Sequence, residues 1–325
     1  MIQVRHKSDV ADIVTSMPNW TTCQTCLPKA RYLSPRELMG RPTQNSWNGS
    51  IPKLIHQSWS DNELPFKFQE WSDTWRTNHP DWEWVLWTDA DNRALVKNHF
   101  PWFKDSYEKL NGEIFKADAV RPLYMYAFGG YVFRLYIQIQ RSIYADLDVE
   151  CLRPFDELFA AEIASSLANR EPSTSPLPCL YQYAYFGQMG TDTNSWSSIP
   201  NAWMASTPHH PFFLMPIESV VQGVGKLLYY WYVEGLTGPH ALFHQIKRYQ
   251  SYQGDNLKLL SYLRTVHIPQ AEFDSYNLVH SITVFEPEVI FPFSFMMADS
   301  DPRKRYCLMS GAKKGDFVGN GVSGI

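Results

Sequence analysis

Segments with strand and helix spacing alternate from residue 51 to about residue 160, and this alternation most constrains the fold. Short runs rich in β-branched and aromatic residues, bounded by Pro, Gly or Asp, are typical of strands. Longer runs with rings at every third or fourth position are typical of helices. We predict strands over 53–57, 82–89 and around YADLD (144–148), and helices over 66–80, 90–100 and 111–130. Alternating strands and helices favour a layered α/β domain with a largely parallel central sheet flanked by helices.

The predicted helix over 111–130 carries Pro122 inside its pattern and is closed by Gly129-Gly130. Because proline lacks an N–H, the helix should kink or start at Pro122. Residues 201–224 predict a strand end, a turn and a helix, and residues 237–250 predict a turn that feeds another helix. Leu242, Ile246 and Tyr249 share one face of that last helix.

The chain divides by composition into three parts. Residues 1–50 are polar with scattered Pro and Gly, and predict an irregular lead-in. Residues 51–300 carry the periodic segments and predict one domain. Residues 301–325 predict an irregular tail. No run approaches 18 consecutive apolar residues, so we expect no membrane span in this chain, and no signal peptide is evident at its start.

Bulk composition excludes few function classes. A net charge of -4 over 325 residues predicts no nucleic-acid partner. The five cysteines are too few for a disulfide scaffold, and the pair Cys23 and Cys26 has no second ligand pair for zinc. Sequons at Asn19 and Asn48 hint at a secretory lumen.

Two aspartates one residue apart, Asp146 and Asp148, are the strongest candidates for chemistry. In an extended strand they would point to the same face, with Leu147 opposite. Two buried carboxylates repel, and a divalent cation such as Mg²⁺ or Mn²⁺, shared with substrate phosphates, would relieve the conflict. A solvated strand face is the alternative, because D-x-D arises often by chance.

The surrounding motifs occur in a recognisable order. IPKLIHQSW, LWTD, DAVR and IYADLDVECLRPFD are followed by NAWMASTPHHPF and TGP. This set, over about residues 51–240, resembles the D-x-D glycosyltransferases of family 32, which include yeast-type Golgi α-mannosyltransferases and mannosyl-inositolphosphoceramide synthases. The resemblance implies a GT-A-type nucleotide-diphospho-sugar transferase fold. It also implies transfer of a hexose, with retention, from GDP-mannose or a UDP-sugar to a glycan or glycolipid acceptor.

The resemblance also implies roles for individual residues on the donor side. Asp148 would be the direct ligand of Mn²⁺ (or Mg²⁺), and Asp146 would hold the metal or the ribose; these two are the catalytic candidates. Trp59 would stack on the base, although a core role is an equal alternative. Asp118 and Arg121 would hydrogen-bond sugar hydroxyls and phosphate.

Further residues follow from the same resemblance. Tyr144 would pack beside the donor, and Asn201 and the turn Thr237-Gly238-Pro239 would lie on the acceptor side. His210, before Pro211, is interpreted as the start of a helix. Family members usually reside in the Golgi, so a secretory lumen is expected, with a cytoplasmic location open because no anchor is visible.

Two departures from the family pattern stand out. Residues 131–142 intervene between Gly129-Gly130 and IYADLD, where the family joins them almost directly; they form either a real insertion or a gene-model artefact. The C-terminus also lacks the usual His- and Trp-containing block.

Two alternatives remain open. One is a haloacid-dehalogenase-type phosphatase with Asp146 as nucleophile and Asp148 as general acid, for which ADSD (298–301) is the best later acidic pair. The other is a sugar-binding relic of the transferase fold that has lost catalysis.

Overall fold

The computed structural model describes residues 28–41, 53–128, 142–168, 181–190, 192–226, 232–252, 256–264, 268–269 and 279–291. The CxxC pair, both sequons, most of the predicted insertion (131–141), ADSD and the tail (301–325) lie outside these ranges. No helix among the described residues is both long and apolar enough to cross a bilayer.

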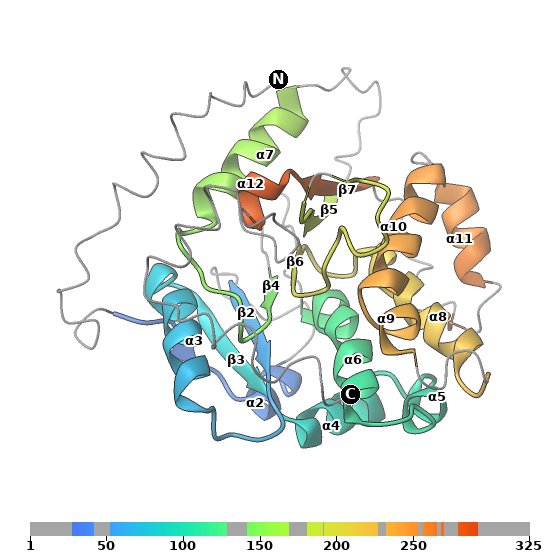
Figure 1. Ribbon diagram of the computed structural model, residues 1–325, viewed down its shortest axis with the longest axis horizontal. Helices are drawn as coiled ribbons and strands as arrows, with labels where there is room; N and C mark the ends of the chain where they lie inside the picture. The colour runs from blue at the N-terminus through green and yellow to red at the C-terminus, as the bar shows by residue number, and fades with distance from the viewer. Residues whose placement is uncertain are drawn as a thin grey trace.

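A seven-stranded mixed sheet organises the described chain, in the order β1-β3-β2-β4-β6-β5-β7 (Figure 1). Only β6 runs antiparallel to its neighbours, β4 and β5; the other pairs are parallel. The strands are β1 Arg31–Tyr32, β2 Leu54–Ser58, β3 Glu83–Trp87, β4 Ser142–Ala145, β5 Tyr181–Gly187, β6 Trp203–Ser206 and β7 Val279–Phe285. The predicted α/β class with a largely parallel sheet is therefore confirmed, and the topology is consistent with a GT-A-like fold.

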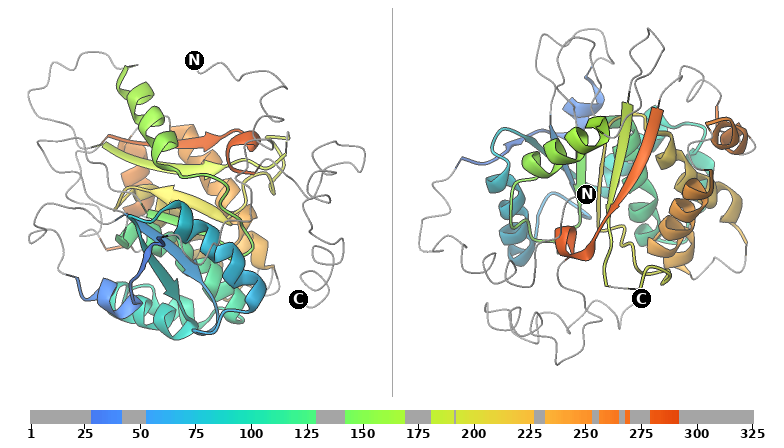
Figure 2. Two further views of the ribbon diagram at one scale, coloured as in Figure 1. Left: turned by 90° about the vertical axis from the view of Figure 1, so that its left-hand side faces the viewer. Right: turned by 90° about the horizontal axis from the view of Figure 1, so that it is seen from above.

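Helices cover both faces of this sheet (Figure 2). They are α2 Pro35–Met39, α3 Phe66–Asn78, α4 Asp89–His99, α5 Lys104–Glu108, α6 Glu113–Phe128, α7 Asp156–Ala168, α8 Leu214–Gly223, α9 Val233–Leu236, α10 Pro239–Tyr252, α11 Asn256–Arg264 and α12 Pro287–Ile290, with a 3₁₀ turn η2 at Pro211–Phe213. α4 begins at a capping box in which Thr88 and Asp91 exchange side-chain to backbone hydrogen bonds. His210 caps η2 by accepting from the Phe212 N–H at 3.2 Å, in agreement with its predicted helix-start role.

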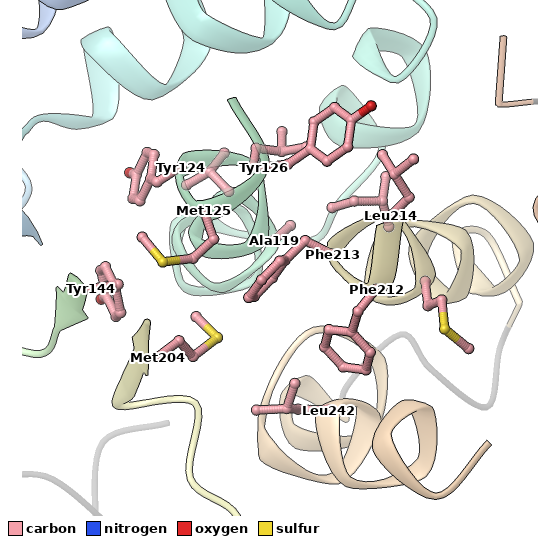
Figure 3. Packing of buried hydrophobic residues seen from close by; sticks show 14 of the residues in the cluster. Ala119, Tyr124, Met125, Tyr126, Tyr144, Met204, Phe212, Phe213, Leu214 and Leu242 are labelled. Atoms are coloured by element: carbon pink, nitrogen blue, oxygen red, sulfur yellow. The ribbon is translucent and has the colours of Figure 1, made fainter. Parts of the chain in front are cut away.

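Strand alternation divides the core into two clusters on opposite faces of the sheet. Val85 and Trp87 lie in the larger cluster, with α6, α8 and α10. Trp84 and Leu86 lie in the smaller one, with Trp75 of α3. Figure 3 shows α6 between the sheet residues Tyr144 and Met204 and the residues of η2, α8 and α10. Because α6 is enclosed on both sides, its position relative to β4 is tightly determined.

The structure corrects two expectations about local structure. α6 does not start at Pro122, which was one of the two predicted outcomes, but runs through it from Glu113 to Phe128; a kink at Pro122 stays a prediction. Burial of that helix segment on all sides outweighs the lost hydrogen bond to the carbonyl of Asp118. The lead-in is not wholly irregular, because β1 pairs with β3 and α2 packs its Leu38 into the core.

Candidate functional site

The two aspartates lie in a turn and not, as predicted, in a strand. β4 ends at Ala145, opposite Trp203, and the Asp146 N–H then donates to the Ala202 carbonyl at 2.8 Å. The Val149 N–H donates back to the Asp146 carbonyl at 3.1 Å, which closes a β-turn. In a turn the alternation of faces no longer holds, so Asp146 is half-buried, Leu147 is buried and Asp148 is exposed.

Arg121 joins Asp146 to Asp118. Its guanidinium bonds both Asp146 oxygens, Nη2 to Oδ1 at 3.1 Å and Nη1 to Oδ2 at 3.2 Å, and Nη2 also lies 3.0 Å from Asp118 Oδ1. Asp118 and Arg121 are one turn apart on α6, on the side that packs against β4. The helix and the strand end therefore build one buried ion cluster from residues 25 positions apart in the sequence.

Tyr144 and Asn201 complete the surroundings of Arg121. The Tyr144 hydroxyl donates to Asp146 Oδ1 at 2.5 Å, and its ring lies 5.1 Å from the guanidinium carbon. The backbone carbonyl of Asn201 accepts from Arg121 Nη1 at 3.4 Å. Arg121 is thus held from three directions, so its orientation does not depend on a ligand.

The predicted acceptor turn packs directly against Asp118. A Cβ built on Gly238 would lie 3.3 Å from Asp118 Oδ2 and 2.8 Å from the Glu234 Cα. Only a glycine allows the start of α10 to approach the cluster this closely. Gly238, which the resemblance placed on the acceptor side, therefore lies beside the donor-side candidate Asp118.

Burial dominates the electrostatics of the cluster. It raises the pKa of Asp118 to about 6, with Arg121 opposing the shift and Asp146 adding to it. Burial also acts to lower the pKa of Arg121, but the attraction of Asp118 and Asp146 outweighs it and raises the pKa above the ordinary value. Asp148 is exposed, yet its pKa is also raised. The larger cause is partial desolvation, and the smaller cause is repulsion from Asp146. The cluster therefore carries an excess of negative charge.

That excess bears on whether a divalent cation fits. Within the described residues, no salt bridge reaches Asp148, whereas both oxygens of Asp146 are already bound. No group of three or more His, Cys, Asp or Glu side chains with metal-ligand geometry occurs in the described ranges. Mg²⁺ and Mn²⁺ often use only one or two carboxylates together with waters and substrate phosphates. An exposed Asp148 beside Asp146 fits this kind of site.

Two residues of the IPKLIHQSW motif, His56 and Trp59, lie in β2 or directly after it, on the strand next to β4. Trp59 directly follows β2, is half-buried, and packs its ring 5.0 Å from Phe68 of α3. His56, within β2, is fully buried; its Nδ1 accepts from Trp87 Nε1 at 3.0 Å, and burial lowers its pKa to about 3. His56 is thus a core residue, while stacking of Trp59 on a base stays a prediction.

Sequence reasoning missed an aromatic group beside the acceptor turn. Trp196, in the loop that precedes β6, stacks on His240 of α10, and the Tyr232 hydroxyl bonds His240 Nδ1. The three residues are up to 44 positions apart and follow no period. The one available signal was that His240 lies two residues after Gly238.

Comparison with known proteins agrees with this geometry. Residues 65–164 match the family model described as "Glycosyltransferase sugar-binding region containing DXD motif", and the match includes Asp118, Arg121, Asp146 and Asp148. This segment is similar to the sugar-binding region of the D-x-D glycosyltransferases. The phosphatase interpretation loses its basis, because its proposed nucleophile lies inside this region and is bound by Arg121 and Tyr144.

Curated relatives of this glycosyltransferase region come from two yeasts. The chain is 29% identical over 218 residues to a mannosyl phosphorylinositol ceramide synthase of Saccharomyces cerevisiae, covering 65% of this chain and 46% of the relative. It is 35% identical over 130 residues to inositol phosphoceramide mannosyltransferase 3 of Schizosaccharomyces pombe, covering 40% and 33%. It is 27% identical over 136 residues to the initiation-specific alpha-1,6-mannosyltransferase of S. cerevisiae, covering 39% and 26%. The chain spans about half, or less, of the length of these relatives.

Proposed function

We propose that this protein is a metal-dependent glycosyltransferase that moves a hexose from a nucleotide sugar to a glycan or glycolipid acceptor. The observation that carries the proposal is the cluster of Asp118, Arg121 and Asp146 beside an exposed Asp148, inside the D-x-D region. The names of the relatives favour mannose, and GDP-mannose as the donor, over a UDP-sugar. Transfer with retention is part of the same proposal.

In this proposal each carboxylate has its own task. Asp148, exposed and without a salt bridge among the described residues, is the direct ligand of Mn²⁺ or Mg²⁺. The bound cation supplies Lewis-acid stabilisation of the departing nucleoside diphosphate. Asp146, held by Arg121 and Tyr144, keeps the turn in place and accepts from the ribose or a metal-bound water.

Asp118 and Arg121 bind the transferred sugar in this proposal. Both side chains are nearly buried, 10% and 15% exposed, so their hydrogen bonds to hydroxyls would act in a region of low dielectric. Their geometry exists without a ligand, which favours an active enzyme over a relic. Catalysis would then depend on positioning and electrostatics. A Golgi or other secretory location is proposed on the family resemblance.

A panel of nucleotide sugars tests the proposal. The purified protein is incubated with Mn²⁺ and GDP-mannose, GDP-fucose, UDP-glucose or UDP-galactose, and release of nucleoside diphosphate is measured. We expect release from GDP-mannose, with loss of at least a hundredfold in Asp148→Asn, about 3 kcal/mol of barrier. Asp105→Asn, an exposed aspartate of α5, is the control and should keep full activity.

The outcomes that contradict the proposal are distinct from one another. Hydrolysis of p-nitrophenyl phosphate with Mg²⁺, without release from any nucleotide sugar, would restore the phosphatase interpretation. Mn²⁺-dependent binding of GDP-mannose in calorimetry, without turnover, would support a sugar-binding relic. Equal activity of Asp148→Asn and wild type would refute the metal assignment.

A further inference from the structure

An exposed tryptophan is held in a fixed position next to the candidate site. The indole of Trp196 is 57% exposed and is the only exposed tryptophan among the described residues. By contrast, five tryptophans lie in the core and are at most 7% exposed: Trp75, Trp82, Trp84, Trp87 and Trp203. So large an apolar ring left in water can still gain free energy by packing against a ligand.

His240 provides one wall of this group. Its imidazole lies parallel to the indole of Trp196, with an interplanar angle of 4° and ring centroids 4.8 Å apart. Desolvation lowers the pKa of His240, so the ring is neutral at neutral pH. A neutral stacked pair covers one face of the indole and leaves the exposed part of Trp196 toward solvent.

Tyr232 in turn fixes His240. Its hydroxyl bonds His240 Nδ1, and the two ring centroids lie 5.5 Å apart in an edge-on arrangement. A Cβ on Gly235 would overlap Cδ1 and Cε1 of Tyr232, so the Tyr232 ring packs directly against that glycine. The exposed indole therefore sits at the end of a chain of fixed contacts, which lowers the entropic cost of binding to it.

The same two segments also line the ion cluster. The loop that carries Trp196 continues to Asn201, whose carbonyl bonds Arg121, and to Ala202, whose carbonyl bonds the Asp146 N–H. His240 lies two residues after Gly238, which contacts Asp118. Glu234 of α9 interacts electrostatically with both Asp118 and His240, so both residues lie near that helix. The stack therefore lies at the rim of the proposed transfer site.

The position of Trp196 favours a role in binding the acceptor and not the donor. α3 lies on the β2 side of β4, and its Lys67 interacts electrostatically with Asp148, whereas α9 and α10 lie on the opposite side of β4 (Figure 1). The proposed metal and diphosphate belong with Asp148. A ring on Trp196 would approach Asp118 from the other direction.

We propose that Trp196 is the stacking platform for the polyhydroxylated six-membered ring of the acceptor, a pyranose or a cyclitol. This inference rests on the proposed transferase function and deepens it. Such rings have a C–H face that packs on an indole while their hydroxyls point to the rim. A linear polyol presents no such continuous C–H face and would gain less from the flat, singly exposed ring.

Ligand binding tests the platform directly. Methyl α-D-mannopyranoside, myo-inositol and linear mannitol are titrated into wild type, Trp196→Ala and Trp196→Phe, with calorimetry or ligand-observed NMR as the readout. Wild type should bind one or both of the ring compounds and not mannitol, and which ring binds distinguishes pyranose from cyclitol. Trp196→Ala should bind that ring about tenfold more weakly, the loss of roughly one stacked ring, and Trp196→Phe should recover most of the affinity. Tyr32→Ala, an exposed aromatic on the edge strand, is the control and should bind as wild type.

Two measurements separate this inference from the proposed function. In Trp196→Ala the KM for the acceptor should rise about tenfold, while acceptor-independent release of nucleoside diphosphate stays as in wild type. Equal ring affinity in Trp196→Ala and wild type, or no ring binding by wild type, overturns the platform even if donor turnover is found. Ring binding that depends on Trp196 without donor turnover keeps the platform and overturns the transferase proposal.

Discussion

Removal of the Arg121 cation is expected to destabilise the protein in a way that depends on pH. Arg121→Met keeps similar volume but leaves Asp118 and Asp146 facing each other without a counter-charge. The side chains involved are only 15%, 10% and 23% exposed. Breaking a buried ion pair by removing one partner costs about 3–5 kcal/mol, because the remaining charge stays buried. We expect a loss in this range at pH 8.

The pH dependence follows from Asp118. Burial already raises its pKa to about 6 with Arg121 present, and loss of the cation would raise it further. A carboxyl whose folded pKa lies above its unfolded value stabilises the fold at low pH, and this contribution is lost as pH rises from about 3.8 through the folded pKa. In Arg121→Met, protonated Asp118 should stabilise the fold up to a higher pH. The loss of unfolding free energy relative to wild type should therefore be smaller at pH 5 than at pH 8.

Urea unfolding at the two pH values measures this effect. Arg93→Met is the matched control, because the Arg93–Glu113 pair at 3.2 Å is 53% and 51% exposed and should contribute only about 0–1 kcal/mol. The reasoning fails if Arg121→Met costs no more than Arg93→Met. It also fails if the cost is the same at pH 5 and pH 8, since the cluster would then not be electrostatically coupled.

Three further predictions follow from the same structure. Asp148→Asn should change the free energy of unfolding by less than about 0.5 kcal/mol while removing Mn²⁺-dependent donor turnover, because Asp148 is exposed; a large drop in melting temperature would contradict this. Gly238→Ala should destabilise by about 1–3 kcal/mol, because its Cβ would lie 2.8 Å from the Glu234 Cα; an unchanged urea midpoint would show that the turn can move. Stability should fall as pH drops from 6.5 toward 4, because burial lowers the pKa of His56 to about 3 and of His280 to about 4, so the unfolded chain binds more protons there. Each of the two histidines should lower the free energy of unfolding by about 1–2 kcal/mol at pH 5. Together they should outweigh Asp118, whose raised pKa stabilises the fold at low pH. Equal urea midpoints at pH 7 and pH 5 would refute this prediction.

The strand and helix pattern was readable because local periodicity and burial agree. Trp84 and Leu86 alternate with Val85 and Trp87 in the sequence, and the two pairs lie in the two separate core clusters. The pattern left open whether the helix would start at Pro122 or continue through it with a kink, and the structure shows that it continues. Enclosure between the sheet and α8 is a tertiary effect, and local propensity contains no information about it.

The residue types and order of the motifs, by themselves, determined the class of fold and the candidates Asp118, Arg121, Asp146 and Asp148, because each motif is a local pattern. Only the tertiary structure decided which aspartate pairs with Arg121 and which stays exposed. The pairing of β4 with β6 ends at Trp203, which turns the chain at Asp146, so Arg121 holds one aspartate and leaves the other exposed. Only the tertiary structure, again, brought Trp196 and His240 together at the rim, since contacts between distant segments depend on packing and not on sequence spacing.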